Sequence, residues 1–136
     1  RMGDPETEVV IPRLKSDLVD LFIATADESL AGKTVEFSEQ SAATIMLVAG
    51  GYPEAYKKGD VINGLEDLKN VIPFHAGTTT SSGNVVTNGG RVIALTGLGD
   101  DIFDALEKSK NAAEKVTWTK RNYRKDIGFD LKKFVK

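Results

Sequence analysis

The chain has 136 residues, of which 40% are apolar and 28% are charged, a composition typical of a soluble globular domain with one substantial core. Its longest apolar run, residues 42–49, is far shorter than the ~18 residues that a membrane-spanning helix needs. Cysteine is absent, which excludes a disulfide framework and thiolate chemistry and fits a cytoplasmic protein.

The formal net charge is −2, but the charges are unevenly distributed. Residues 115–136 hold eight Lys or Arg against Asp126 and Asp130, while the preceding residues hold ten basic and eighteen acidic side chains. Such a basic end can contact the phosphates of a nucleic acid or of a small substrate, or it can simply be solvated. It shows no basic-aromatic RNA-binding motif.

The first thirty residues are predicted to be helical with one interruption. Asp4 is the expected N-cap and Pro5 the first helical residue, and Pro12 interrupts the pattern. A second helix is expected from Ser16, its N-cap, to a stop at residues 31–33. Its apolar stripe has helical spacing and comprises Leu14, Leu18, Leu21, Phe22, Ala26 and Leu30.

Short strands are predicted next. Residues 44–48 form a β-branched apolar run typical of a buried strand, which residues 50–53 end with a Gly-Gly-Tyr-Pro turn. Shorter strands are expected at 35–37 and 61–62, and Asn63-Gly64 is typical of a tight hairpin turn.

The second half is predicted to be an antiparallel meander followed by a long helix. The expected strands cover 71–76, 85–87 and 91–96, with turns near 81–83 and 88–90. The clearest helix follows the Gly97-Leu98-Gly99 segment and begins near two aspartates. Its apolar face comprises Ile102, Phe103, Leu106, Ala113 and Val116, and one more short strand is expected at 117–119. This order of elements predicts an α+β fold with a small curved antiparallel sheet and one packed helix.

The stretch from Phe74 to Arg91 is a candidate site, because a polar glycine-rich loop lies between two predicted strands. In it, Gly77 would let a backbone approach a ligand, Thr78 offers a hydroxyl, and His75 can exchange a proton. Arg91 can bind a phosphate or carboxylate with two nitrogens. The alternative is a plain hairpin with glycines at its turns. His75 is the only histidine and has no cysteine partner, which argues against a zinc site or a hydrolase triad.

Two further segments combine charge with a helix start. In the first, Arg1, Asp4 and Glu6 surround a predicted helix N-terminus, where carboxylates can hold an amine and the arginine a phosphate. The alternative is a capped helix with ordinary surface charges. In the second, residues 97–101 lack the full G-x-G-x-x-G pattern and carry two acids, so a strand-to-helix turn is favoured over a phosphate loop.

Five segments in order resemble one family, phosphoribosylamine–glycine ligase, also called glycinamide ribonucleotide synthetase. They are RMGDPETEVVIPRLKSDL, GGYPEAYKKGDVINGL, FHAGT, TNGGRVIALTGLG and YRKDIG. The resemblance implies that residues 1–32 are the end of an ATP-grasp domain. Residues 33–136 would be the ligase's C-terminal domain, a small antiparallel β-barrel or sandwich of the rudimentary hybrid type with a packed helix.

The resemblance also implies an activity, the ATP-dependent joining of glycine to 5-phosphoribosylamine in cytoplasmic de novo purine biosynthesis. Magnesium would neutralise the nucleotide's charge, and the metal ligands are expected just upstream of Arg1. The chain therefore resembles a piece of a longer enzyme, and alone it is expected to hold neither ATP nor Mg²⁺ and to be inactive. The partners would be the small-molecule substrates, with no nucleic acid and no membrane.

The resemblance assigns residues to two groups. Arg1, Asp4 and Glu6 match the motif on the catalytic, substrate-facing side, and the expected substrate-binding residues are His75, Gly77, Thr78 and Arg91. Three alternatives stay open: a non-catalytic structural or phosphoribosyl-binding module, nucleic-acid binding through residues 115–136, and a carboxylase-type ATP-grasp subunit. The FHAGT and YRKDIG segments argue against the last of these.

Overall fold

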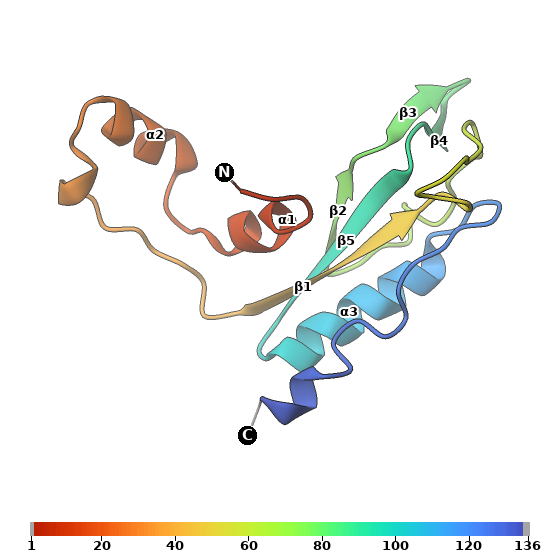
Figure 1. Ribbon diagram of the computed structural model, residues 1–136. Coiled ribbons are helices and arrows are strands. Elements are labelled where there is room, and N and C mark those ends of the chain that lie inside the picture. Colours follow the sequence, from red (N-terminus) through yellow and green to blue (C-terminus); the bar gives the residue numbers. More distant parts are fainter. Residues whose placement is uncertain (1, 135–136) are drawn as a thin grey trace.

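A computed structural model describes residues 2–134 and shows an antiparallel sheet covered on one face by a long helix (Figure 1). The strands of this sheet follow the order β1-β5-β2, with both neighbours antiparallel to the central β5. A separate hairpin pairs β3 with β4. The bounds are β1 Ser41–Val48, β2 Val71–His75, β3 Thr78–Ser81, β4 Asn84–Thr87, β5 Arg91–Gly99 and α3 Ile102–Lys115. The α+β class with antiparallel strands and one packed helix is thereby confirmed.

The core lies between the sheet and α3. Along β1 the side chains alternate, so that Ala43, Ile45 and Leu47 are buried while their neighbours are half-buried. The main cluster of buried residues comprises Ile45, Leu47, Ala49, Ile62, Val92, Ile93, Leu95, Ala112, Ala113, Val116 and Trp118. None of the helices in residues 2–134 has both the length and the apolar composition needed to cross a membrane.

Small residues allow α3 to lie close to β5. Gly97 belongs to β5 rather than to a turn, and a Cβ atom there would lie 2.5 Å from the carbonyl oxygen of Ala105. The buried Ser109 accepts a hydrogen bond from Gly97 N (2.8 Å) and donates to the carbonyl of Ala43 (2.7 Å). One helix residue thereby links two neighbouring strands. The predicted turn at 97–101 is thus shorter than expected, since the strand continues to Gly99.

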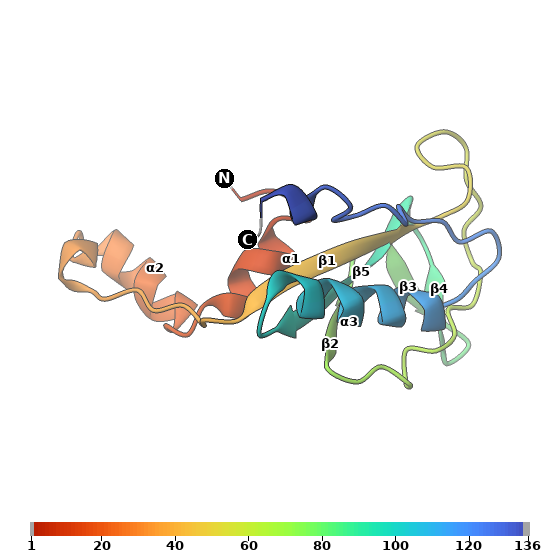
Figure 2. The same cartoon turned by 90° about the horizontal axis from the view of Figure 1, so that it is seen from below.

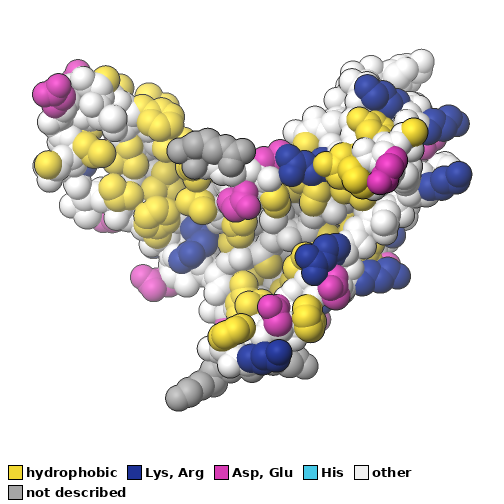
Figure 3. Space-filling model, viewed as in Figure 1, with side chains coloured by type: hydrophobic (Ala, Val, Ile, Leu, Met, Phe, Trp, Pro, Cys, Tyr) yellow, Lys and Arg dark blue, Asp and Glu magenta, His cyan; other side chains and the backbone are white. Residues whose placement is uncertain are grey.

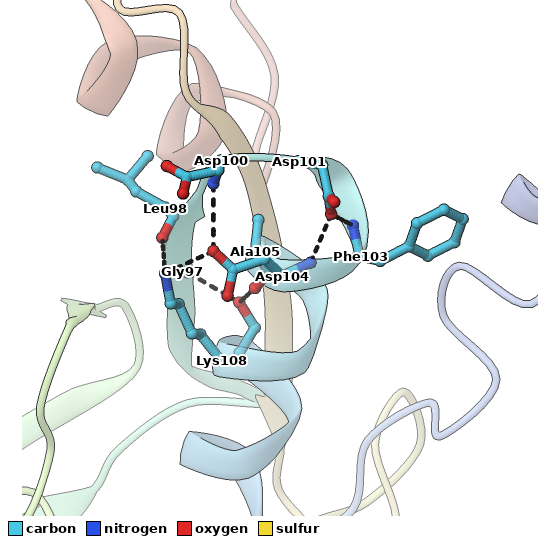
Figure 4. Close-up of polar contacts among 9 residues, drawn as sticks. Gly97, Leu98, Asp100, Asp101, Phe103, Asp104, Ala105 and Lys108 are labelled. Atoms are coloured by element: carbon cyan, nitrogen blue, oxygen red, sulfur yellow. Dashed lines mark hydrogen bonds and ion pairs between the residues drawn. The ribbon is translucent and has the colours of Figure 1, made fainter. Parts of the chain in front are cut away.

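The start of α3 is fixed by acidic side chains, as Figure 4 shows. Asp101 is the N-cap, and its carboxylate accepts hydrogen bonds from the backbone N–H groups of Phe103 and Asp104, both at 2.8 Å. Lys108 donates to the carboxylate of Asp104 (2.8 Å) and to the carbonyl of Leu98 (2.9 Å). The segment that was considered as a phosphate loop is therefore occupied by the protein's own carboxylates.

Acid should weaken this junction. The hydrogen bond from Lys108 holds the pKa of Asp104 below its usual value. The stabilisation is therefore fully present above the unfolded-state pKa of about 4, and it is lost as the pH falls through the lower folded-state value. Asp104→Asn should reduce the slope of melting temperature against pH below about 4, measured by circular dichroism. Asp67→Asn on an exposed loop is the control, and an equal change in both variants would contradict the prediction.

The predicted meander is wrong in its strand order. β2 pairs directly with β5, from Val71 opposite Gly97 to His75 opposite Ile93, so the 85–87 strand does not lie between them. It belongs instead to β4, which pairs with β3 through a two-residue turn. In that turn Ser82 and Gly83 have φ values of 48° and 80°, as a tight two-residue hairpin requires.

Isolated bridges connect the two sheets into an incompletely closed barrel. Val61 pairs with Val86 of β4, Asn63 pairs with Thr117, and Val48 of β1 pairs with Asn122. The strands predicted at 61–62 and 117–119 are thus reduced to single bridges. The hairpin turn expected at Asn63-Gly64 is wrong, because Asn63 exchanges two backbone hydrogen bonds of 3.0 Å with Thr117.

The first part of the chain forms an arm, residues 2–38, whose beginning packs through α1 against β1 and β5 and whose remainder, with α2, projects away from the barrel (Figure 2). Its helical segments are α1 Thr7–Val10, η1 Ile11–Arg13, α2 Leu18–Ala26 and η2 Leu30–Gly32. The helix expected to begin at Asp4-Pro5 begins only at Thr7, with Glu6 at the N-cap position. The predicted Ser16 cap is also wrong, because the carboxylate of Asp17 accepts from Val19 N and Asp20 N.

The apolar stripe of the arm is not buried. In α2 only Ala24 is buried, whereas Phe22 is 63% exposed and Ile23 is 54% exposed. Figure 3 shows hydrophobic side chains gathered over the surface of the arm. The two ends of the projecting segment are joined by a short pairing of Leu14 with Phe37. Among the residues that the structure describes, therefore, neither hydrophobic core cluster includes a residue of α2.

Candidate functional site

Two of the predicted sites, far apart in the sequence, meet at one ion pair. Arg91, the first residue of β5, points its guanidinium at Asp4 in the loop before α1. Its Nη2 donates to Asp4 Oδ2 at 2.6 Å, and its Nη1 donates to the backbone carbonyl of Asp4 at 3.0 Å. The two nitrogens therefore hold both the side chain and the backbone of the acidic loop.

The backbone at Arg91 is itself tightly packed. Gly77 N donates to the Arg91 carbonyl at 2.9 Å, and a Cβ atom on Gly77 would lie 2.6 Å from Gly89 Cα. A Cβ atom on Gly90 would clash with the Tyr52 ring, 2.1 Å from Cδ2. These glycines allow two chain segments to cross. Gly77 was expected to approach a ligand, but its nearest neighbours are protein backbone.

His75 and Thr78 lie beside this crossing, at the end of β2 and the start of β3. His75 Nδ1 and Thr78 Oγ1 share a hydrogen bond of 3.0 Å, and His75 is exposed. Within residues 2–134, no three His, Asp or Glu side chains are arranged to hold a metal ion. The pair can order the loop or present a proton to a ligand.

The acidic loop is closed on itself. Thr7 donates from its backbone N to the carbonyl of Gly3 at 3.1 Å, and its hydroxyl donates to the same oxygen. The Glu6 carboxylate folds back so closely that a Cβ atom on Gly3 would clash with it. Arg1, the remaining predicted residue, lies outside the described residues. The structure thus brings Asp4, Gly77 and Arg91 together and places His75 and Thr78 next to them.

A groove of about 290 Å³ begins at Pro5, the residue after Asp4. Residues of β1 form its floor, between Pro5 and the C-terminal segment. It is lined by Pro5, Thr44, Ile45, Met46, Val48, Asn122, Tyr123, Arg124 and Ile127. An apolar floor with a few polar side chains at the margin is typical of a small-molecule site.

Arg124 is the cation of this groove, and no role was predicted for it although it lies in the YRKDIG segment. Its Nη2 and Nε donate to the two carboxylate oxygens of Asp126 at 2.9 and 3.1 Å. The guanidinium lowers the pKa of Asp126, and the carboxylate raises that of Arg124. The ion pair between Arg124 and Asp126 could have been suspected from the sequence, because the two residues are only two positions apart. The position of Arg124 on the groove could not.

The neighbouring residues tie the C-terminal segment to α3. Arg121 Nη1 donates to the carbonyls of Val116 (2.8 Å) and Ala113 at the end of the helix, and its guanidinium lies 5.0 Å from the centre of the Tyr123 ring. Tyr123 donates a hydrogen bond to Glu114. The pKa of the tyrosine is raised mainly by its burial and also by the neighbouring carboxylate of Glu114. Two arginines of the basic end therefore have structural partners.

Comparison with known proteins gives consistent matches. The family model described as "Phosphoribosylglycinamide synthetase, C domain" matches residues 42–130. A phosphoribosylamine–glycine ligase from Pasteurella multocida is 47% identical over 130 residues, which cover 95% of this chain and 30% of that protein. One from Neisseria meningitidis serogroup A is 49% identical over 129 residues, again 30% of its length. This chain thus spans about a third of such relatives.

Two other matches extend the comparison. A bifunctional purine biosynthetic protein from Dictyostelium discoideum aligns with 94% of this chain, which covers 16% of that protein. The crystal structure of phosphoribosylamine–glycine ligase from Thermotoga maritima superposes with a TM-score of 0.73 at 36% identity. It covers 93% of this chain, and the match spans 31% of that protein.

Proposed function

Because this chain belongs to the phosphoribosylglycinamide synthetase C-domain family, we propose that it is the C-terminal part of a ligase that joins glycine to 5-phosphoribosylamine. In that reaction ATP converts the glycine carboxylate into an acyl phosphate. The amine of the ribosyl substrate then displaces phosphate from the acyl group to give glycinamide ribonucleotide, so that the ADP formed in the first step and inorganic phosphate are the other products. The observation that carries the proposal is the meeting of the Asp4 loop with Arg91 beside the groove.

The described residues do not fit a site for magnesium and ATP. No three carboxylate or imidazole groups converge within residues 2–134, and the carboxylates at the start of α3 are bonded to backbone N–H groups and Lys108. We therefore assign the nucleotide and metal to the rest of the ligase, with the metal ligands upstream of Arg1.

We propose that this chain supplies one wall of the substrate cleft. Asp4 and Glu6 provide negative charge that suits an amine, and the groove from Pro5 to Arg124 has the size of a small-molecule site. His75 offers an imidazole and Thr78 a hydroxyl, next to the close approach of Gly77 to Gly89. The role of these residues is to bind and orient the substrates. Orientation of two reactants removes a large part of the activation barrier of a bimolecular transfer.

The arm supports a place inside a larger enzyme. Its exposed apolar side chains, among them Val19, Phe22 and Ile23, gather on one projecting segment. A contiguous exposed apolar patch of this kind is typical of a surface that packs against another protein part. We propose that residues 1–32 complete an ATP-grasp domain and that residues 33–136 form the C-terminal domain. The pairing of Leu14 with Phe37 then lies at the joint between them.

The test is an assay of the full-length gene product that contains this chain. Phosphate release should require ATP, glycine and 5-phosphoribosylamine together, and omission of any one should abolish it. The 136-residue chain alone should release none. A full-length product without this three-substrate dependence would refute the ligase function, and turnover by the chain alone would refute the assignment of ATP and metal to the rest of the enzyme.

A further inference from the structure

We infer that Arg91 is a positioning residue, which fixes the Asp4 loop against the barrel instead of binding a substrate phosphate itself. The inference rests on the proposed function only in that the loop lies on the substrate side. Both guanidinium contacts go to one residue, Asp4, through its carboxylate and its backbone carbonyl. An arginine used in this way fixes a backbone position as well as a charge.

The barrel side of the contact is rigid. The register of β1 and β5 shifts between Leu47 and Val48, and Val48 is the partner of Arg91. A bulge of this kind redirects a neighbouring side chain. On its other side the Arg91 carbonyl is held by Gly77 N, and Gly90 O accepts from Ala49 N at 2.8 Å. The direction of the arginine is therefore set by both neighbouring segments.

The loop side of the contact ends at the groove. Asp4 lies between Gly3, whose carbonyl accepts from Thr7, and Pro5, which lines the groove opposite Asn122 and Arg124. A displacement of Asp4 must therefore move Pro5, because the two residues are consecutive. Through this connection, Arg91 sets the position of one groove wall without touching a bound ligand.

The exposure of the pair favours a geometric role. The side chains of Arg91 and Asp4 are 39% and 47% exposed, so the ion pair is well hydrated. Exposed pairs contribute little to global stability. The ion pair is the side-chain salt bridge that joins the loop to β5, and the other polar contacts of the loop are hydrogen bonds within residues 3–10. Loss of the pair should consequently release the loop while the barrel stays folded.

Hydrogen exchange on the 136-residue chain tests the contact directly. In Arg91→Ala, the amides of residues 7–10 should exchange about two- to fivefold faster, while those of β1 and β5 stay unchanged. Asp4→Ala should give the same increase, and the double variant should give no more. Lys58→Ala, which removes an exposed cation elsewhere, is the control. Unchanged exchange in both single variants would overturn the inference.

Kinetics of the full-length gene product separate positioning from direct binding. If Arg91 positions the loop, Arg91→Ala and Asp4→Ala should each lower kcat/KM for the ribosyl substrate about tenfold, with no further loss in the double variant. Arg91→Lys should recover only part, since an ammonium group cannot reproduce the two-nitrogen contact. If Arg91 binds phosphate, Asp4→Ala should free it and tighten binding, which would overturn the inference. Exchange that responds as expected in a product without ligase activity would refute only the proposed function.

Discussion

Gly97→Ala is expected to lower the free energy of unfolding by about 3 kcal/mol, because the contact between β5 and α3 has no room for a methyl group. A Cβ atom at this position would lie 2.5 Å from the carbonyl oxygen of Ala105 and 2.9 Å from the Ser109 hydroxyl. Ser109 is fully buried and bonded to Gly97 N. The helix must therefore shift, or this hydrogen bond must break. Urea unfolding followed by the fluorescence of Trp118, the single tryptophan, measures the loss.

Gly32→Ala is the matched control for this prediction. No heavy atom lies within 4 Å of a Cβ built on Gly32, and its φ is outside the left-handed region. The change should therefore alter the free energy of unfolding by less than about 0.5 kcal/mol. Equal losses in the two variants would show that chain flexibility, and not the helix–strand contact, causes the effect at Gly97.

Gly97 shows where local sequence patterns stop being informative. The two glycines before a helix indicated either a phosphate loop or a turn, and the absence of a full glycine motif favoured the turn. The structure gives a third reason for them, since Gly97 and Gly99 lie in a strand under α3. This reason depends on the distance between β5 and α3, which no local pattern contains.

Elements with an apolar sequence were predictable, whereas a polar strand and the order of the strands were not. The apolar runs of β1 and β5 and the periodic face of α3 are typical of buried elements, and β2 has an apolar run although none of its residues is buried. β3 was missed because its sequence, Thr-Thr-Thr-Ser, is polar and largely exposed. Strand order was missed because a hairpin lies between β2 and β5 in the sequence but outside their sheet.

The residues of the candidate site can be selected from the sequence, but their arrangement cannot, and their roles stay predictions. Asp4 and Arg91 were both selected by their chemistry, one beside a helix start and one after a glycine pair. Their ion pair joins positions 87 residues apart, so only the fold reveals that each is the other's partner. Arg124 received no role because its importance depends on the groove that it lines.

Leu47→Ala is expected to lower the free energy of unfolding by about 3–4 kcal/mol, whereas Phe22→Ala in the same chain should change it by less than about 0.5 kcal/mol. Leu47 is fully buried in the core beneath α3, and Phe22 is 63% exposed on α2. Truncation of Leu47 leaves a cavity, but truncation of Phe22 removes only solvated surface. Urea unfolding of both variants gives the comparison.

In the full-length gene product the two variants should become similar. If the arm packs on the rest of the ligase as proposed, Phe22 is buried there and Phe22→Ala should cost about 3 kcal/mol or more. A near-neutral effect in that protein would contradict the packing of the arm. If Phe22→Ala instead destabilises the isolated chain, a second copy covers α2 in solution. Sedimentation at two concentrations would then show a dimer that Phe22→Asp dissociates.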